Sequence, residues 1–263
     1  MSLLDVGRPS DICGTVFGNG LQREAGSGMT MTYQAEVSRI RDLTHDVREL
    51  ELALHEPSRL SFKAGQFISF EVPKVGLSQP VVRPYSIASP PSIDDRVVLV
   101  FNLVQGGPGS QYLYGLQAGD IVRFKGPAGS FYLREDPNRR MLCVATGTGI
   151  APLRSMIVSE LERQSPQPVT LFWGLRYERD LYYRDELEAL ASRFPRFSFV
   201  TCLSRPGPDW TGVRGRVTDL VREQVTSVRD LAVYLCGNGA MIKDVTALLQ
   251  TKGLCPIYRE KYY

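Results

Sequence analysis

The sequence has little of what a metal centre or an iron–sulfur cluster requires. Its 263 residues include two histidines and five cysteines. No two cysteines form a C-x-x-C pair, which is the spacing typical of zinc and iron–sulfur ligands. The histidines have no neighbours of ligand type, so we expect no metal. Cys143, Cys202 and Cys236 lie in apolar runs and are predicted to be buried thiols, which fits a reducing cytoplasm.

Long apolar runs and an excess of one charge are also absent. No run approaches the roughly 20 residues that a membrane-spanning helix needs, and the N-terminus lacks a basic start followed by an apolar segment. The net charge of +3 is small and the basic residues are scattered, so nucleic acid is not expected, although a local basic patch could attract an acidic protein. We expect a monomeric, cytoplasmic protein without a membrane span.

Hydrophobic periodicity divides the chain into three parts. Residues 1–30 show little periodicity and are expected to form a mobile extension. Residues 31–136 contain six short strands separated by Gly, Pro, Asp and Ser turns, which predicts a small antiparallel β-barrel. In residues 137–263, apolar strands alternate with helices, which predicts an α/β domain with a parallel sheet covered on both faces. Such sheets bind ligands at the carboxyl ends of their strands.

A predicted strand at 83–89 carries groups that a flavin dinucleotide needs. Arg83 offers a guanidinium fork for a diphosphate, and Tyr85 an aromatic face for a flat ring. Ser86 can donate or accept a hydrogen bond and points to the opposite face of the strand. Pro84 has no N–H group, so the strand is expected at a sheet edge. A plain barrel strand with an incidental tyrosine is the alternative.

Two glycine-rich loops precede helical segments. The loop Gly106–Ser110 leads into a predicted helix at 110–116, where free backbone N–H groups could cradle an anion. The alternative is an ordinary turn with Ser110 as the N-cap. The loop Gly147–Pro152 follows a buried strand, and its glycines would let a diphosphate approach the backbone. It lacks the final glycine of the G-x-G-x-x-G fingerprint.

Polar and small residues follow the other strands of the predicted parallel sheet. Cys236 ends one strand, and its small side chain could line a flat pocket without filling it. Four arginines lie in or just after loops at the same edge of the sheet, and they are Arg176, Arg205, Arg214 and Arg216. Ser204 and Arg205 together could hold a ribose phosphate. The alternative is a set of solvated surface arginines.

The chain end at 257–263 has the pattern of a final strand with aromatic residues. This pattern favours a role for Tyr262 in covering a flat ring and for Glu260 in acting near it. A simple edge strand is the alternative.

Taken in this order, the motifs over residues 31–263 resemble those of the ferredoxin–NAD(P) reductase superfamily. The resemblance implies that Arg83 binds the FAD diphosphate, that Tyr85 stacks on the isoalloxazine and that Ser86 reaches its N5 edge. It implies four catalytic positions, Ser86, Cys236, Glu260 and Tyr262. These residues would orient and polarise the reacting groups rather than act as nucleophiles. The cofactor-binding positions that it implies are Arg83, Pro84, Tyr85, Ser86, Asn102, Val104, Gly107, Gly109, Ser110, Thr146, Gly147, Thr148, Gly149, Pro152, Arg176, Ser204, Arg205, Arg216, Cys236, Gly237, Tyr262 and Tyr263.

The activity implied by this resemblance is that of an FAD-dependent reductase. Electrons pass between NADPH, or NADH, and a one-electron carrier such as ferredoxin or flavodoxin, with hydride transfer at flavin N5. Ser204 and Arg205, with Arg176 and Arg216, look like the site for the 2′-phosphate of NADPH.

Three alternatives stay open at this point. The segments 126–133 and 258–262 look like those of NADH-dependent reductase components of oxygenases, although the cysteine cluster of their fused iron–sulfur domain is absent here. The chain could also be a flavin electron-transfer subunit of a larger complex. The third alternative is a dinucleotide-binding module that holds no flavin.

Overall fold

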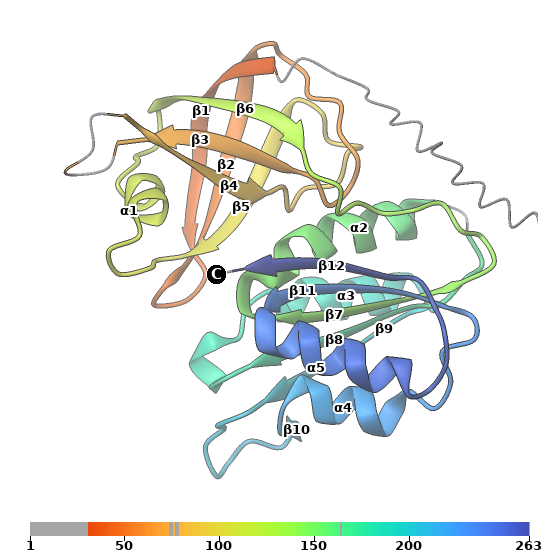
Figure 1. Ribbon diagram of the computed structural model, residues 1–263. Coiled ribbons are helices and arrows are strands. Elements are labelled where there is room, and N and C mark those ends of the chain that lie inside the picture. Colours follow the sequence, from red (N-terminus) through yellow and green to blue (C-terminus); the bar gives the residue numbers. More distant parts are fainter. Residues whose placement is uncertain (1–30, 74–75, 77–78, 164, 263) are drawn as a thin grey trace, which may run out of the picture.

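A computed structural model describes residues 31–73, 76, 79–163 and 165–262. The extension expected at residues 1–30 lies outside this range. The described chain forms an antiparallel barrel that lies over an α/β layer, and a short linker joins the two (Figure 1). The predicted fold class, a β-barrel followed by a parallel-sheet α/β domain, is confirmed.

The barrel contains six antiparallel strands in the order β4-β3-β6-β1-β2-β5. They are β1 (Met31–Asp42), β2 (Val47–Glu56), β3 (Phe67–Val72), β4 (Val81–Ser86), β5 (Arg96–Asn102) and β6 (Ile121–Ala128). β4 is an edge strand, as the missing N–H group of Pro84 predicts. Just beyond β4, Ile87 forms a bridge with Leu99 of β5, so the two edges of the sheet approach each other.

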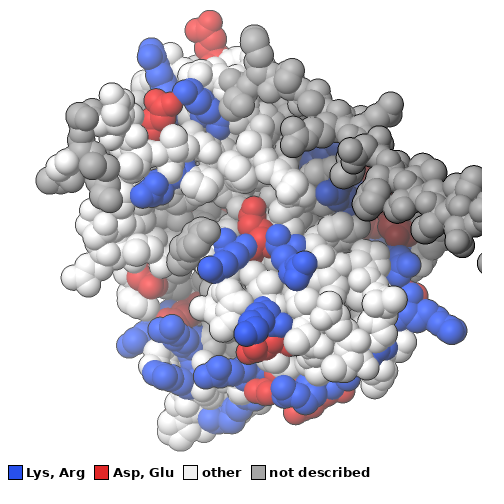
Figure 2. Space-filling view, viewed as in Figure 1, with Lys and Arg blue, Asp and Glu red and all other residues white. Residues whose placement is uncertain are grey.

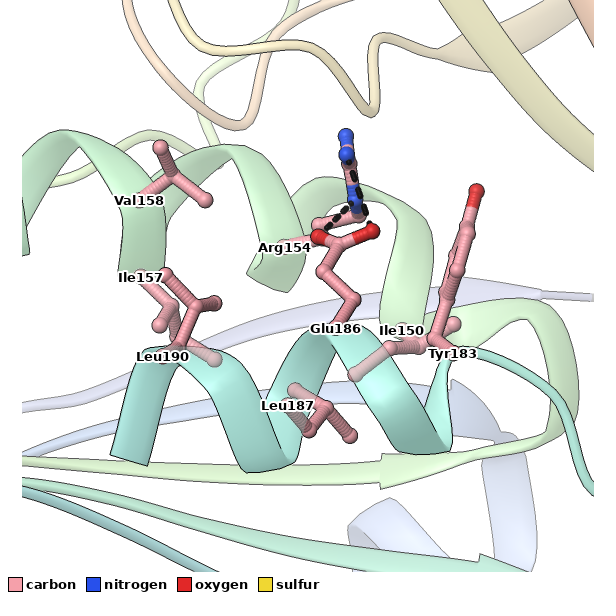
Figure 3. Close-up of a pocket in the computed structure, with 8 residues that line it drawn as sticks. All are labelled: Ile150, Arg154, Ile157, Val158, Tyr183, Glu186, Leu187 and Leu190. Atoms are coloured by element: carbon pink, nitrogen blue, oxygen red, sulfur yellow. Dashed lines mark hydrogen bonds and ion pairs between the residues drawn. The ribbon is translucent and has the colours of Figure 1, made fainter. Parts of the chain in front are cut away.

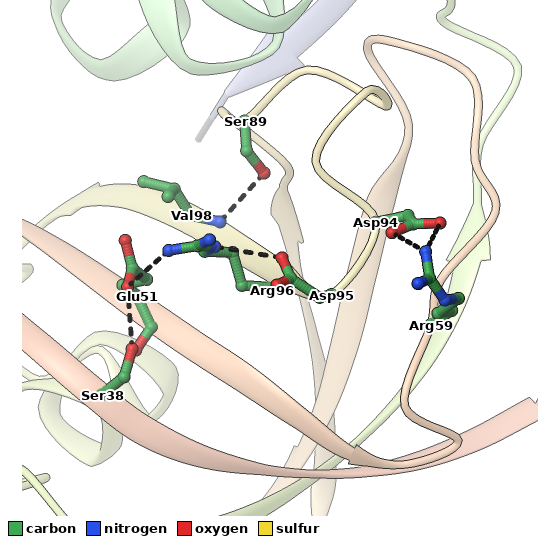
Figure 4. Close-up of polar contacts among 8 residues, drawn as sticks. All are labelled: Ser38, Glu51, Arg59, Ser89, Asp94, Asp95, Arg96 and Val98. Carbon is green, nitrogen blue, oxygen red and sulfur yellow. Dashed lines mark hydrogen bonds and ion pairs between the residues drawn. The ribbon is translucent and has the colours of Figure 1, made fainter.

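The loop between β4 and β5 is held by side-chain contacts (Figure 4). The hydroxyl of Ser89 accepts a hydrogen bond from the Val98 N–H at 3.1 Å. Arg59 donates to both carboxylate oxygens of Asp94, at 2.7 and 2.8 Å. These contacts fix the chain immediately after the strand predicted to bind flavin.

The short helix α1 (Pro108–Tyr114) begins earlier than predicted. Gly107 is the N-cap and Pro108 the first helical residue, a position that suits the fixed φ of proline. Ser110 is therefore not the N-cap. Its buried hydroxyl accepts the Val104 N–H at 3.0 Å and lies 3.2 Å from the Gly107 carbonyl. The hydroxyl of Ser110 thus stabilises the loop itself.

The α/β layer has a six-stranded parallel sheet in the order β10-β9-β8-β7-β11-β12. Its strands are β7 (Arg140–Thr146), β8 (Val169–Leu175), β9 (Phe197–Leu203), β10 (Val213–Arg214), β11 (Leu231–Asn238) and β12 (Ile257–Tyr262). Its helices are α2 (Ile150–Glu162), α3 (Arg184–Arg193), α4 (Val217–Gln224) and α5 (Gly239–Gln250), with short 3-10 turns at Gly147–Gly149 and Glu178–Asp180.

Helices cover both faces of this sheet, as the continuous apolar strands predict. Helices α2 and α3 lie on the barrel side and α4 and α5 on the other side (Figure 1). Along β7, Cys143 packs with the first pair and Val144 with the second. Cys143, Cys202 and Cys236 are all fully buried, as predicted. No described helix is long and apolar enough to cross a membrane.

Residues 181–194 are amphipathic and acidic at their start, a pattern that predicts a helix from residue 181. Helix α3 starts three residues later, at Arg184. Tyr183 has φ 56° and ψ 12°, a left-handed conformation that a helix cannot include. The expected helix start is therefore wrong. The left-handed conformation of Tyr183 goes with a tertiary contact, because its side chain reaches the barrel.

Candidate functional site

The edge strand β4 presents an aromatic ring beside a guanidinium. The ring of Tyr85 packs edge-on against Phe70 and Phe101, with centroids 5.9 and 5.6 Å apart. Burial raises the pKa of Tyr85 to about 12, partly offset by the nearby charge of Arg83. Tyr85 therefore stays neutral at physiological pH, and its neighbours fix the orientation of its ring.

Helix α1 approaches this strand closely through a glycine. A Cβ atom on Gly109 would lie 2.5 Å from the hydroxyl oxygen of Tyr85 and 2.8 Å from Cγ of Arg83. Only glycine allows this approach of backbone to side chains. Among the described residues, Arg83 makes one hydrogen bond, from Nη1 to the Val82 carbonyl at 2.8 Å, and no ion pair. A guanidinium without a carboxylate partner beside a glycine backbone fits the diphosphate of FAD.

The four predicted catalytic residues meet where the barrel touches the end of the parallel sheet. The hydroxyl of Ser86, on β4, donates to Oε2 of Glu260, on β12, at 3.0 Å. Strands β11 and β12 pair in parallel, and this register places Cys236 beside Glu260. The hydroxyl of Tyr262 interacts with Ser86 and with the Cys236 thiol.

Burial sets the protonation of this cluster. It raises the pKa of Glu260 to about 7, although the hydrogen bond from Ser86 opposes the shift. It also raises the pKa values of the Cys236 thiol and the Tyr262 hydroxyl well above their ordinary range. Glu260 is therefore the member of the cluster that changes charge near neutral pH.

The loop after β7 packs directly on the end of β11. A Cβ atom on Gly149 would lie 2.4 Å from the carbonyl oxygen of Cys236, so glycine is required there. Gly147 has φ 53°, and its carbonyl accepts hydrogen bonds from the Trp173 indole at 3.0 Å and the Tyr182 hydroxyl at 3.2 Å. The two donors hold the predicted dinucleotide loop in one shape.

Further contacts join this loop to its surroundings. The hydroxyl of Thr146 accepts the Asn238 N–H at 2.9 Å. A Cβ atom on Gly237 would lie only 2.3 Å from the same oxygen, so glycine is needed there. Thr148 lies 3.4 Å from the side-chain oxygen of Asn102 at the end of β5, a contact between the two domains. Pro152 is buried in the first turn of α2.

The loops after β8 and β9 lie side by side and carry the predicted 2′-phosphate residues. Arg205 N–H donates to the Arg176 carbonyl at 2.8 Å, and the hydroxyl of Ser204 donates to the Leu175 carbonyl at 3.3 Å. Within the part of the chain that the structure describes, the guanidinium groups of Arg176, Arg205 and Arg216 are exposed and make no hydrogen bond or ion pair.

The fourth arginine in this region, Arg214, is different. Its Nη2 donates to the carbonyls of Gly207, Pro208 and Trp210 at 3.0, 2.8 and 2.7 Å. Arg214 therefore stabilises its own loop. Figure 2 shows basic side chains gathered at the lower left, over the region where Figure 1 draws β10.

Val104 is 44% exposed on the loop before α1, and its N–H donates to the Ser110 hydroxyl at 3.0 Å. Tyr263 lies outside the described residues. The structure adds residues that sequence reasoning missed, notably Trp173, Tyr182 and Tyr183. No local pattern marks them, because each acts through a contact with a residue distant in the sequence. No group of three or more His, Cys, Asp or Glu among the described residues is placed to hold a metal ion.

The geometry fits a barrel that holds a flavin and an α/β domain that holds a dinucleotide. Sequence comparison defines the class of protein as an oxidoreductase. Residues 34–132 match the Oxidoreductase FAD-binding domain family and residues 143–247 match the Oxidoreductase NAD-binding domain family.

Two curated relatives and two solved structures show which proteins the chain is similar to. Ferredoxin–NADP reductase B of Sorangium cellulosum is 38% identical over 82% of this chain and 90% of its own length. The ferredoxin–NAD(P)(+) reductase component of the naphthalene 1,2-dioxygenase/salicylate 5-hydroxylase systems of Ralstonia sp. is 37% identical over 86% of this chain and 68% of its own length.

Among solved structures, the cytochrome P450 reductase GcoB of Amycolatopsis is 34% identical, with a TM-score of 0.80 over 88% of this chain and 69% of its own. The ferredoxin NADP+ reductase of Neisseria gonorrhoeae has a TM-score of 0.75 over 88% of this chain and 99% of its own. At 23% identity, it shows the shared fold alone. The chain belongs to the ferredoxin–NAD(P) reductase superfamily.

Proposed function

We propose that the chain is an FAD-dependent reductase that passes electrons from NADPH to a small one-electron carrier protein such as ferredoxin or flavodoxin. The observation that carries this proposal is the hydrogen bond from Ser86 to Glu260 at 3.0 Å. It joins the flavin-type strand of the barrel to the last strand of the α/β sheet, where Cys236 and Tyr262 also lie. A flavin held by the barrel and a nicotinamide held by the α/β domain would meet at this junction.

The barrel would hold FAD through β4 and α1. Arg83 would pair with the diphosphate, and Tyr85 would present its face to the isoalloxazine. The backbone of Gly107 and Gly109 would lie beside the phosphates that Arg83 holds, because helix α1 packs so closely on Arg83 and Tyr85 that a Cβ on Gly109 has no room. When bound, FAD supplies the exchange between a two-electron hydride and single electrons.

The α/β domain would hold NADPH across the carboxyl ends of its strands. The loop Gly147–Gly149 would receive the diphosphate. The exposed guanidinium groups of Arg176, Arg205 and Arg216 have no partner among the described residues, which suits a 2′-phosphate. This observation favours NADPH over NADH.

Glu260 and Ser86 would control protonation at the junction and orient the groups that react there. With a pKa of about 7, Glu260 can hold or release a proton while its Oε2 accepts the Ser86 hydroxyl. Tyr262 would cover the flat ring until the nicotinamide takes its place, and the buried Cys236 would line that place without ionising. Positioning supplies the rate contribution of all four residues.

The carrier protein is proposed from the relatives. The Sorangium relative, which this chain matches over 90% of its length, is named a ferredoxin–NADP reductase. A second candidate function is that of an NADH-dependent reductase component of an oxygenase system. It is favoured by the 37% identity to the Ralstonia reductase component and by the structural match to GcoB.

Steady-state kinetics distinguish the two functions. Purified protein is assayed with NADPH and with NADH, ferredoxin or flavodoxin as carrier, and cytochrome c as final acceptor. We expect kcat/KM for NADPH to exceed that for NADH by at least about tenfold, the worth of a charge-assisted phosphate contact. A preference for NADH would support the oxygenase component, and no turnover with either nucleotide would contradict a reductase.

A further inference from the structure

Two consecutive tyrosines before α3 make contacts that no part of the proposed function uses. Tyr182 and Tyr183 are both buried. Tyr183 is the one residue other than glycine with a positive φ among the described residues. Such a conformation is unfavourable for a bulky L-residue and persists only where surrounding contacts determine it. The contacts of the pair therefore need an explanation.

Tyr182 acts on the predicted dinucleotide loop. Its hydroxyl and the indole N–H of Trp173 both donate to the carbonyl of Gly147. The two rings meet edge to face, with centroids 4.8 Å apart. The same carbonyl also accepts the backbone N–H of Ile150 at the end of the 3-10 turn. Tyr182 thus helps to hold Gly147 at φ 53°, which turns the loop toward the end of β11.

Tyr183 acts in the opposite direction and reaches the barrel. Its hydroxyl donates to Oε2 of Glu49 on β2. Arg41, on β1, donates to the same oxygen at 3.1 Å. Because burial raises the pKa of Tyr183 well above its ordinary value, the hydroxyl remains a donor at physiological pH. The residue next to the dinucleotide-loop contact is therefore bonded to the flavin-type domain.

Arg154 on α2 adds a second contact of the same kind. Its guanidinium pairs with Glu186 through two hydrogen bonds of 2.7 and 3.2 Å, and lies 5.1 Å from the ring centroid of Tyr183. The third nitrogen donates to the Ala88 carbonyl at 2.7 Å. Ala88 comes two residues after Ser86, so the helix that follows the dinucleotide loop is bonded to the flavin-type strand.

These side chains enclose almost no space. The pocket that Arg154, Tyr183 and Glu186 line together with apolar residues of α2 and α3 has a volume of about 10 Å³, and Figure 3 shows Arg154 and Glu186 facing each other beside Tyr183. This volume admits at most about one water molecule. The cluster is a packed contact between domains and has no room for a ligand.

We propose that Tyr183 is a positioning residue for hydride transfer. Through Glu49 it fixes the α/β domain against the barrel and so sets the approach of nicotinamide to flavin, whereas its neighbour Tyr182 sets the shape of the loop that binds the nucleotide. The inference rests on the proposed function, since both cofactors must be bound for the approach to matter. The two adjacent residues thus control different quantities. Tyr183 affects the rate of hydride transfer, and Tyr182 affects the affinity for the nucleotide.

Single hydroxyl deletions test this separation. Tyr182→Phe and Tyr183→Phe keep the rings and remove one hydrogen bond each. Tyr33→Phe is the matched control, because among the described residues the hydroxyl of this buried barrel tyrosine hydrogen-bonds only to the sulfur of Met31, at 3.9 Å. Stopped-flow reduction of the flavin in the holoprotein by NADPH gives a limiting rate and an apparent Kd for each protein.

We expect Tyr183→Phe to lower the limiting rate at least about fivefold with the Kd within about twofold, because small misplacements of reacting atoms cost rate. We expect Tyr182→Phe to raise the Kd at least about fivefold with the limiting rate within about twofold. Tyr33→Phe should match the unsubstituted protein in both.

Substitution of Glu49 provides an independent test from the barrel side. Glu49→Ala should lower the limiting rate as Tyr183→Phe does, and Glu49→Gln, which keeps an acceptor oxygen, should restore most of it. Limiting rates of Tyr183→Phe and Glu49→Ala equal to that of Tyr33→Phe would overturn the inference. Failure of NADPH to reduce the flavin of the unsubstituted protein would instead contradict the proposed function, and the inference with it.

Discussion

Replacing Glu260 by glutamine should remove a pH dependence of stability that this one carboxyl group creates. Burial raises its pKa in the folded chain to about 7, against an ordinary value of 4.5. The folded state therefore binds a proton that the unfolded state has lost between these two values. Stability contributed by this proton is present below pH 4.5, falls as pH rises, and is lost above about pH 7.

The size of the effect follows from the same two values. The difference between about 7 and 4.5 corresponds to about 3–4 kcal/mol, at about 1.4 kcal/mol per pH unit. Between about pH 5 and about pH 8, the free energy of unfolding should fall by about 2–3 kcal/mol because of Glu260 alone. Glutamine has nearly the same shape and does not titrate, so Glu260→Gln should lack this contribution.

Urea unfolding at about pH 5 and about pH 8 measures this effect. The quantity compared is the free energy of unfolding of the unsubstituted chain and of Glu260→Gln. The difference in free energy of unfolding between the unsubstituted chain and Glu260→Gln should change by about 2–3 kcal/mol in favour of the variant on going to the higher pH. Glu223→Gln is the control, because Glu223 is exposed on α4 and should give no such change. A difference that does not depend on pH, or that changes in the opposite sense, would refute the reasoning.

Three further predictions concern the loops and the terminal aromatic residue. Tyr262→Ser should lower the Kd for NADP+ at least about fivefold, because a ring that competes for the same place is removed; an unchanged Kd in an equilibrium titration would show that Tyr262 does not cover the flavin. Arg205→Ala should raise the KM for NADPH about 10- to 100-fold and leave that for NADH unchanged; an equal rise for both nucleotides would remove Arg205 from the 2′-phosphate. Gly149→Ala should destabilise the fold by about 1–3 kcal/mol in urea unfolding, because its Cβ would meet the Cys236 carbonyl oxygen at 2.4 Å. Gly115→Ala, whose nearest contact would be an ordinary 3.5 Å, should be tolerated, and equal stability of the two variants would contradict the clash.

The fold could be predicted well from sequence because its pattern is local. Alternation within each barrel strand and continuous apolar runs in the parallel strands decide which face of each strand is buried. Pro84 alone indicates the edge position of β4. Helix starts were predicted less well. The start of α1 depends on Pro108 and that of α3 on the left-handed Tyr183, whose conformation follows from a contact with the barrel.

The candidate site could be predicted only where motifs and resemblance supplied it. Ser86 and Glu260 are 174 residues apart, and no periodicity brings them together. Position near the carboxyl end of a strand does not by itself distinguish Arg205 from Arg214, and only the pairing with Ser204 and the resemblance single out Arg205. The fold separates them, because Arg214 donates to three carbonyls of its own loop and Arg205 has no partner for its guanidinium among the described residues.

The central claim is that the strand with Arg83, Tyr85 and Ser86 holds a flavin that a nicotinamide nucleotide reduces. An absorbance spectrum of the purified chain, followed by anaerobic addition of NADPH, tests this claim most directly. The account predicts a flavin spectrum that one equivalent of NADPH bleaches. A chain that shows no flavin spectrum, even after FAD is added, would contradict it.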